Sequence, residues 1–261
     1  MRRALAFLTP FGRTVDPDPA SLLWFPLIGA VLGTLLGTLW WALHGVLPPA
    51  VAAALVVAAD LVLTRANHLD GLENAADGLL SFRGTRDGRL EAMQASRAAP
   101  TGLVAAGVVL VVRWLVLTAS TPSVLLVTGV WAASRGTVAV VALSVPYARR
   151  QEGLASVFLD TPPPTPTGDE TPWLLVRHRR SSTLRRKRSR SAVGAVALVV
   201  SLAALLGWNR VGATVTLGAG LVTAWAVVLF ARHRVGGLTA DVLGTVDVLS
   251  ETAALAMALV W

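Results

Sequence analysis

Seven apolar stretches divide the sequence, and they limit the fold more than any other feature. Most have about 18 or more residues, the length that an α-helix needs to cross a bilayer core. One, 50–64, is shorter and contains Asp60. The stretches are 22–43, 50–64, 102–119, 123–145, 192–208, 213–230 and 242–261. Because backbone polar groups in lipid must bond to one another, the sequence predicts an all-α, polytopic membrane bundle of about seven transmembrane helices.

The basic residues predict how these helices are oriented. With the N-terminus inside, nearly all of the 23 Lys and Arg residues lie in inner segments. Among the few exceptions, Arg210 lies outside, and Arg113 and Arg135 lie within spans. Retention of Lys and Arg on the cytoplasmic side produces this bias. We therefore expect a multi-pass protein of the cell (inner) membrane with a cytoplasmic N-terminus, and the short apolar patch before Pro10 does not resemble a cleavable signal peptide.

A proline-rich and basic segment interrupts the apolar pattern. Residues 160–172 are DTPPPTPTGDETP, and residues 177–190 are RHRRSSTLRRKRSR. The basic run predicts contact with anionic lipid, and contact with an anionic substrate is the alternative. We expect one membrane-embedded domain over 1–261, with a cytoplasmic loop at about 150–190. Topology explains the net charge of +8 without nucleic acid, and the lack of cysteine excludes thiolate chemistry and disulfides.

Carboxylate and amide side chains gather just after the second apolar stretch, where residues 68–79 are HLDGLENAADGL. In a helix, Asp70, Asn74 and Asp77 would share one face, with Glu73 beside them. Oxygen ligands on one stripe suit Mg²⁺, which proteins typically bind through one or two carboxylates plus substrate phosphates. The alternative is a solvated amphipathic stretch whose carboxylates balance nearby arginines.

The neighbours of this cluster also favour phosphate chemistry. Gly71 and Gly78 each follow an aspartate, and glycine is costly inside a helix, so we expect them to leave room for a ligand. Downstream, Arg86, Arg89 and Arg97 could neutralise charge on a transferred phosphate and its leaving group. Each arginine could instead be an ordinary loop charge.

The residues also carry a family resemblance. HLDGLENAADGL is similar to the HLDGLADTADGL signature of the cobalamin synthase family, the adenosylcobinamide-GDP ribazoletransferases. The blocks LAFLTP and WFPLIGAVLG, RLEAMQASR, PYARRQEGLASVF and GGLTADVLG resemble that family in the same order. Asn74, Ala95 and Val248 depart from the pattern, each where the family commonly has a carboxylate. We expect these departures to weaken metal binding.

The resemblance implies a reaction and a site. A ribose hydroxyl of α-ribazole, or of its 5′-phosphate, attacks the corrinoid-linked phosphate of adenosylcobinamide-GDP, and GMP leaves. The product is adenosylcobalamin or its 5′-phosphate, and Mg²⁺ is the expected cofactor, bound by Asp70, Asn74 and Asp77. The implied catalytic residues are Asp70, Glu73, Asp77 and Arg97, with Glu73 and Asp70 both open as the proton acceptor. The implied substrate-binding residues are His68, Arg89, Arg149, Arg150, Glu152 and Asp241. The oligomeric state stays open.

Two other functions compete with this interpretation. A CDP-alcohol phosphotransferase of lipid synthesis would also use clustered aspartates and Mg²⁺ at a membrane face, but its DGxxAR signature has no match in DGLENA. A transporter or scaffold would place ionisable residues near mid-span. Arg113 and Arg135 do lie within predicted spans, where we expect them to face the bundle interior. They would either pair with Asp60, Asp241 or Asp247 or contact a substrate.

Overall fold

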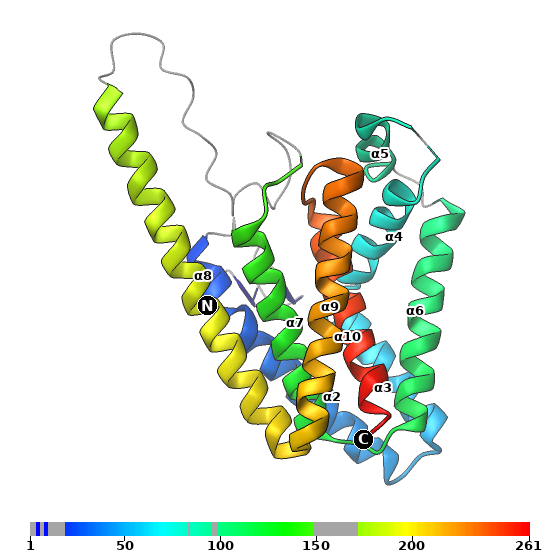
Figure 1. Ribbon diagram of the computed structural model, residues 1–261. Coiled ribbons are helices and arrows are strands. Elements are labelled where there is room, and N and C mark those ends of the chain that lie inside the picture. Colours follow the sequence, from blue (N-terminus) through cyan, green and yellow to red (C-terminus); the bar gives the residue numbers. More distant parts are fainter. Residues whose placement is uncertain (1–3, 6–7, 10–18, 83, 96–98, 149–171) are drawn as a thin grey trace.

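The protein is a helical bundle (Figure 1), and no strand occurs in the residues that its computed structural model describes. Those residues are 4–5, 8–9, 19–82, 84–95, 99–148 and 172–261, with the backbone alone described at 19–20 and 172–188. The elements are η1 (Pro19–Trp24), α2 (Phe25–His44), α3 (Pro49–Leu63), α4 (Asn67–Leu79), α5 (Arg86–Ala92), α6 (Pro100–Ala119), α7 (Val124–Ser144), α8 (Pro172–Trp208), α9 (Arg210–Val235) and α10 (Ala240–Ala258). The all-α prediction is confirmed.

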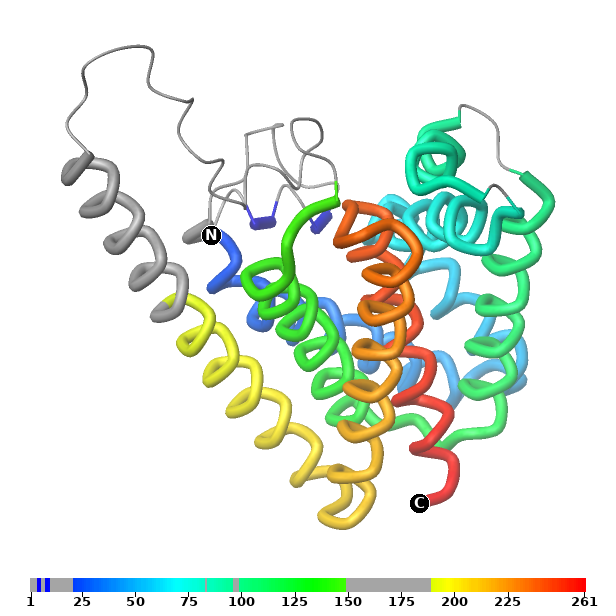
Figure 2. The backbone as a smooth tube through the Cα atoms, turned by 45° about the horizontal axis from the view of Figure 1, so that its top comes forward, coloured from blue at the N-terminus to red at the C-terminus, as the bar shows by residue number. Residues whose placement is uncertain are grey.

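The helices are arranged around α7 and α10. Helix α7 packs against α2 and α8, and α10 packs against α9, α4 and α7. Figure 2 shows α8 at one edge of the bundle and α6 at the opposite edge. The side chains of α7 and α10 are mostly buried, whereas those of α6 and α9 leave many large apolar groups exposed. Such an apolar exterior matches a surface that faces lipid.

Five segments in the described residues are long and apolar enough to cross a membrane. They are Ser21–His44, Pro100–Ala119, Val124–Ser144, Ser189–Trp208 and Arg210–Val235, and α3 with α4 makes a sixth if that bent pair counts as one span. Helix α10 is not among them because it carries Asp241, Asp247 and Glu251. The multi-pass bundle therefore agrees with the expected architecture. The predicted span 50–64 corresponds to α3, which is one half of the bent pair, and the predicted span 242–261 corresponds to α10, a charged helix at the centre of the bundle.

The chain turns sharply between α3 and α4, whose axes meet at 86°. Arg65 and Ala66 both have a φ of 53°, a left-handed conformation that costs a residue with a Cβ about 1–2 kcal/mol. The Ala66 N–H donates to the Leu61 carbonyl at 2.8 Å, and the Thr64 hydroxyl donates to the Asp60 carbonyl at 2.7 Å. The break sends α4 away from the direction of α3, just before the carboxylate-rich stretch.

Two arginines fasten the polar segments at one end of the bundle. Arg86 in α5 donates to the carbonyls of Val235 at 2.8 Å and Ala148 at 2.5 Å. Arg234 in α9 donates to the carbonyl of Leu79 at 2.9 Å, at the end of α4. Helices α4 and α5 therefore lie at the same end of the bundle as the turn between α9 and α10, with the C-terminus at the other end (Figure 1). The contacts of Arg86 are with backbone carbonyls, which differs from the expected role in phosphate binding.

Candidate active site at the crossing of two helices

Two carboxylates from different helices meet at one amide group. The Asn74 side-chain amide donates to Asp70 Oδ2 at 3.2 Å and to Asp241 Oδ1 at 3.4 Å. Asp70 and Asn74 lie one turn apart in α4, while Asp241 lies in the first turn of α10. Asp70 is exposed and the other two are half-buried, so the cluster is open to solvent or to a ligand. We call these three residues the outer cluster.

The donor set of the outer cluster fits a hard divalent cation. It offers two carboxylates and, once the Asn74 amide turns its oxygen toward them, one amide oxygen. Mg²⁺ commonly takes one or two carboxylates and completes its shell with water and substrate phosphates. In the described residues, no three His, Asp or Glu side chains form a closed metal cage. The cluster therefore suits a cation that is shared with a bound substrate better than one held by protein alone.

Asp77 has a different set of contacts from the one that the sequence predicts. Both of its carboxylate oxygens accept backbone N–H groups, from Ala99 and Gly102, at 2.6 Å each. These amides belong to the start of α6, where a carboxylate satisfies free N–H groups and complements the helix dipole. Asp77 is buried and faces α6, whereas the Asn74 amide bonds to Asp70 and Asp241. The metal-binding role of Asp77 stays a prediction.

The glycines of this stretch make room for other helices, which corrects the expectation of ligand space. A Cβ on Gly71 would lie 3.2 Å from the Cα of Gly244 in α10. A Cβ on Gly78 would lie 2.7 Å from the Arg89 carbonyl in α5, and one on Gly102 would lie 2.4 Å from the Glu73 carbonyl. Close backbone approach thus explains the glycines: α5 approaches α4 at Gly78, and α6 approaches α4 where Gly102 meets Glu73.

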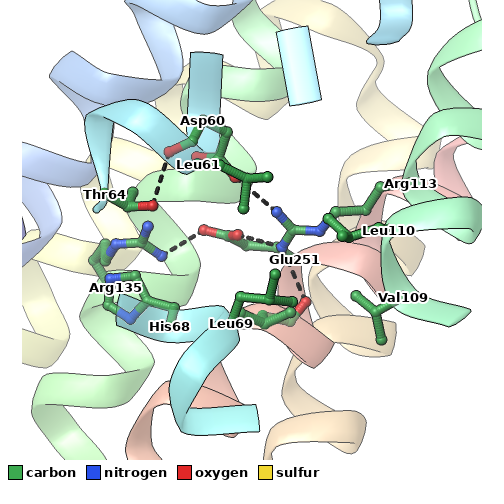
Figure 3. A pocket seen from close by; sticks show the side chains of 11 residues that line it. Asp60, Leu61, Thr64, His68, Leu69, Val109, Leu110, Arg113, Arg135 and Glu251 are labelled. Carbon is green, nitrogen blue, oxygen red and sulfur yellow. Dashed lines mark hydrogen bonds and ion pairs between the residues drawn. The ribbon is translucent and has the colours of Figure 1, made fainter. Parts of the chain in front are cut away.

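A buried network of charges lies deeper in the bundle (Figure 3). Arg113 bonds to Asp60 at 2.8 Å and to Glu251 at 2.6 Å. Arg135 bonds to Asp247 and, at 2.5 Å, to Glu251. Because buried charges are stable only when paired, these contacts explain why two arginines can lie inside the spans. The predicted pairing with Asp60 and Asp247 is confirmed, while Glu251 is a partner that the sequence analysis missed.

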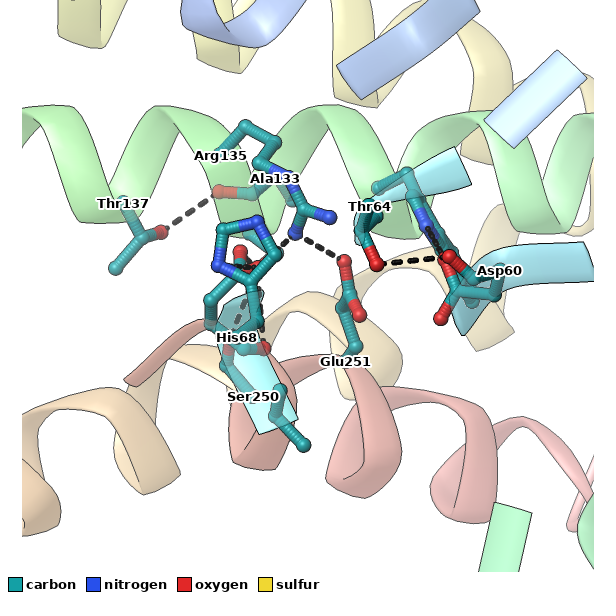
Figure 4. A network of polar contacts seen from close by, with 12 residues as sticks. Asp60, Thr64, His68, Ala133, Arg135, Thr137, Ser250 and Glu251 are labelled. Atoms are coloured by element: carbon teal, nitrogen blue, oxygen red, sulfur yellow. Dashed lines mark hydrogen bonds and ion pairs between the residues drawn. The ribbon is translucent and has the colours of Figure 1, made fainter. Parts of the chain in front are cut away.

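His68 joins this network from the first turn of α4. Its Nδ1 lies 3.2 Å from Asp247 Oδ2, and its side chain is 14% exposed. Figure 4 shows the imidazole beside Arg135 and Glu251. A small pocket next to it is lined by Asp60, Leu61, Thr64, His68, Leu69, Val109, Leu110, Arg113, Arg135, Val248 and Glu251. The observed contact of His68 is therefore with the buried network, where it helps to fix the start of α4, and its role in substrate binding stays a prediction.

The remaining predicted site residues lie outside the described residues: Arg97, Arg149, Arg150 and Glu152. Their neighbours are placed, however. The Ala148 N–H donates to the Leu238 carbonyl at 2.7 Å, and Leu238 precedes Asp241 by three residues. The chain therefore enters the segment after Ala148 from the same end of the bundle as the outer cluster.

Known proteins resemble this chain over nearly its whole length. The family model described as cobalamin-5-phosphate synthase matches residues 1–176. An adenosylcobinamide-GDP ribazoletransferase from Chlorobaculum tepidum is 30% identical, covering 99% of this chain and 93% of the relative. Its counterpart from Syntrophobacter fumaroxidans is 32% identical, covering 98% and 96%.

A third counterpart, from Ralstonia nicotianae, is 31% identical and covers 91% of this chain and 83% of the relative. No solved structure matches the chain. The family model spans more than half of the sequence, and these three relatives cover 91–99% of the chain. The chain therefore belongs to the cobalamin-5-phosphate synthase family.

Proposed function

We propose that this protein joins adenosylcobinamide-GDP to α-ribazole, or to α-ribazole 5′-phosphate, and releases GMP. The products are adenosylcobalamin, or its 5′-phosphate, and GMP. Besides family membership, one observation carries the proposal: Asp70 and Asp241, from two helices, converge on Asn74 at the open end of the bundle. Transfer of the corrinoid-linked phosphate away from GMP needs such a cluster of oxygen ligands, because charge on the diphosphate must be neutralised by a cation.

Mg²⁺ is the cofactor that we propose, with Asp70, Asn74 and Asp241 as the residues that would hold it. When bound, the ion would neutralise the diphosphate and polarise the phosphate under attack. In this proposal Asp77 fixes the start of α6 against α4, and thereby supports the cluster without touching the ion. This replaces Asp77 with Asp241 as the third oxygen ligand.

Other residues of the chain complete the proposed site. Glu73, half-buried beside the outer cluster, and Asp70 are the two candidates to accept the ribose proton. Arg89 lies in α5, next to the end of α4, and would contact a phosphate or the nucleotide. The proposal retains the predicted catalytic role of Arg97. It also retains the predicted substrate-binding roles of Arg149, Arg150 and Glu152. The excess of basic residues at this end of the bundle supports its placement on the cytoplasmic side.

Incubation of the purified full-length protein with adenosylcobinamide-GDP, α-ribazole and Mg²⁺ tests the proposal. Chromatography should show GMP and a cobalamin product in equal amounts, and a chelator should stop their formation. Asp241→Asn should lower the rate about 10-fold or more at limiting Mg²⁺, because it removes one of two carboxylates. GMP formation without a cobalamin product, or a rate that is independent of divalent cations, would contradict the proposed reaction or its cofactor.

A further inference from the structure

Helices α4 and α10 meet at three levels, spaced by three residues on each helix. At the deep level, His68 Nδ1 lies 3.2 Å from Asp247 Oδ2. At the middle level, Gly71 faces Gly244, so closely that a Cβ on Gly71 would lie 3.2 Å from the Gly244 Cα. At the outer level, the Asn74 amide donates to Asp241 at 3.4 Å. Each step of three along α4 thus matches a step of three backwards along α10.

The deep level is fixed from a third helix. Asp247 is fully buried and also accepts hydrogen bonds from Ser134 and Arg135 of α7. Its carboxylate therefore cannot turn toward another partner without leaving buried donors unpaired, which costs about 1–3 kcal/mol each. Because His68 Nδ1 lies 3.2 Å from this fixed carboxylate, the first turn of α4 is held at one height along α10.

The middle level sets the distance between the two helices. A Cβ on Gly244 would lie 3.2 Å from the His68 carbonyl oxygen and 3.3 Å from the Gly71 Cα, which is tighter than an ordinary van der Waals contact. The Thr245 hydroxyl also donates to the Gly71 carbonyl at 3.3 Å. Because these neighbours are backbone atoms, an added methyl group would push α4 away from α10 by a few tenths of an ångström.

We propose that the Gly71–Gly244 contact and Asp247 are positioning elements of the proposed reaction, which set the gap between the two carboxylates of the outer cluster. The deep level fixes the height of α4 along α10, and the middle level fixes the distance between the two helices. At the outer level, Asp70 and Asp241 then both reach the Asn74 amide. Cation ligands must be held to within about 0.5 Å, so a small separation of α4 from α10 weakens the site. The inference rests on the proposed function, because it concerns the same cluster.

Two matched glycine substitutions test the middle level. Gly244→Ala adds a methyl group at the crossing, whereas Gly218→Ala adds the same group on α9, where nothing lies within 4 Å. Electron paramagnetic resonance measures the dissociation constant of Mn²⁺ from the full-length protein. It reports on the outer cluster without turnover, because Mn²⁺ takes the same oxygen ligands as Mg²⁺. We expect Gly244→Ala to raise the Mn²⁺ dissociation constant about 10-fold and Gly218→Ala to leave it unchanged.

Thermal unfolding of the same variants separates positioning from stability. Alanine is the better helix former by about 1 kcal/mol, so neither variant should lose much stability from propensity alone. A weaker Mn²⁺ affinity at an unchanged unfolding midpoint supports the inference. An unchanged Mn²⁺ affinity in folded Gly244→Ala overturns it.

His68 provides a second test if Gly244→Ala does not fold. His68→Asn keeps an N–H donor at the position of Nδ1, whereas His68→Ala removes it. We expect Mn²⁺ affinity to fall about 10-fold in His68→Ala and to be largely restored in His68→Asn. Equal affinities in the alanine variant and the parent overturn the positioning role of the deep level. If the parent binds Mn²⁺ but forms no GMP, the proposed function fails while the inference about the cluster stands.

Discussion

At the scale of the residue, Asn74 determines the character of the outer cluster. Its amide nitrogen lies between two carboxylates and donates to both, so it occupies a place that also suits a cation. The amide thereby reduces the repulsion between Asp70 and Asp241 when no cation is bound. An aspartate at this position would instead bring a third negative charge into the cluster.

Asn74→Asp should therefore lower the Mg²⁺ concentration that gives half-maximal turnover, because affinity for hard cations rises with ligand charge. It should also lower the unfolding midpoint in the absence of divalent ions, and Mg²⁺ should restore it. Titration of GMP formation against Mg²⁺, together with thermal unfolding with and without the ion, measures both effects. The control is Asn67→Asp, the same change at an exposed residue of α4. An equal Mg²⁺ response in the two variants would contradict the role given to Asn74.

At the scale of the element, α4 shows what a sequence can and cannot reveal. The helical face shared by Asp70, Asn74 and Asp77 followed from their spacing, because helical periodicity is a local property. The spacing could not reveal that Asp241 is a partner of Asn74, because Asp241 lies 167 residues away and only the fold brings the two together. The sequence showed that Gly71 and Gly78 are costly in a helix and therefore have a reason. It could not show which reason, because a bound ligand and a closely packed helix both require the absence of a side chain. The bend at Arg65 and Ala66 was not predictable from the sequence, because neither residue is a glycine although both have a positive φ.

Asp77→Asn tests whether this carboxylate serves α6 or a cation. The substitution replaces one acceptor oxygen by an NH₂ group that faces the Ala99 or Gly102 N–H, and it removes the charge at the helix start. We expect a loss of about 0.5–2 kcal/mol of stability, as for a lost helix cap, seen as a lower unfolding midpoint. If Asp77 acts only through α6, the Mg²⁺ concentration for half-maximal turnover stays at the parent value. A large increase in that concentration at an unchanged midpoint would instead make Asp77 a metal ligand, as the sequence predicts.

At the scale of the whole molecule, the buried charges tie the bundle together. Arg113 of α6 and Arg135 of α7 both bond to Glu251 of α10, while Asp60 brings in α3. The apolar runs predicted the helices because any chain must satisfy its backbone in lipid. They could not predict which helices meet, nor that the charged face of α10 lies at the centre of the bundle. The network therefore acts as a set of specific contacts where apolar surfaces alone would allow several arrangements.

Glu251→Gln should weaken the whole bundle, because two buried guanidinium groups would lose a shared negative partner at once. Breaking one partner of a buried ion pair costs about 3–5 kcal/mol, and Gln offers a single acceptor oxygen in place of two. We expect a clearly lower midpoint of thermal unfolding for the purified protein in detergent. Asp87→Asn, the same kind of change at an exposed residue of α5, should leave the midpoint near that of the parent. If both variants unfold at the parent temperature, Glu251 contributes no charge to the network, and the packing of α10 must rest on its apolar contacts and its close approach to α4.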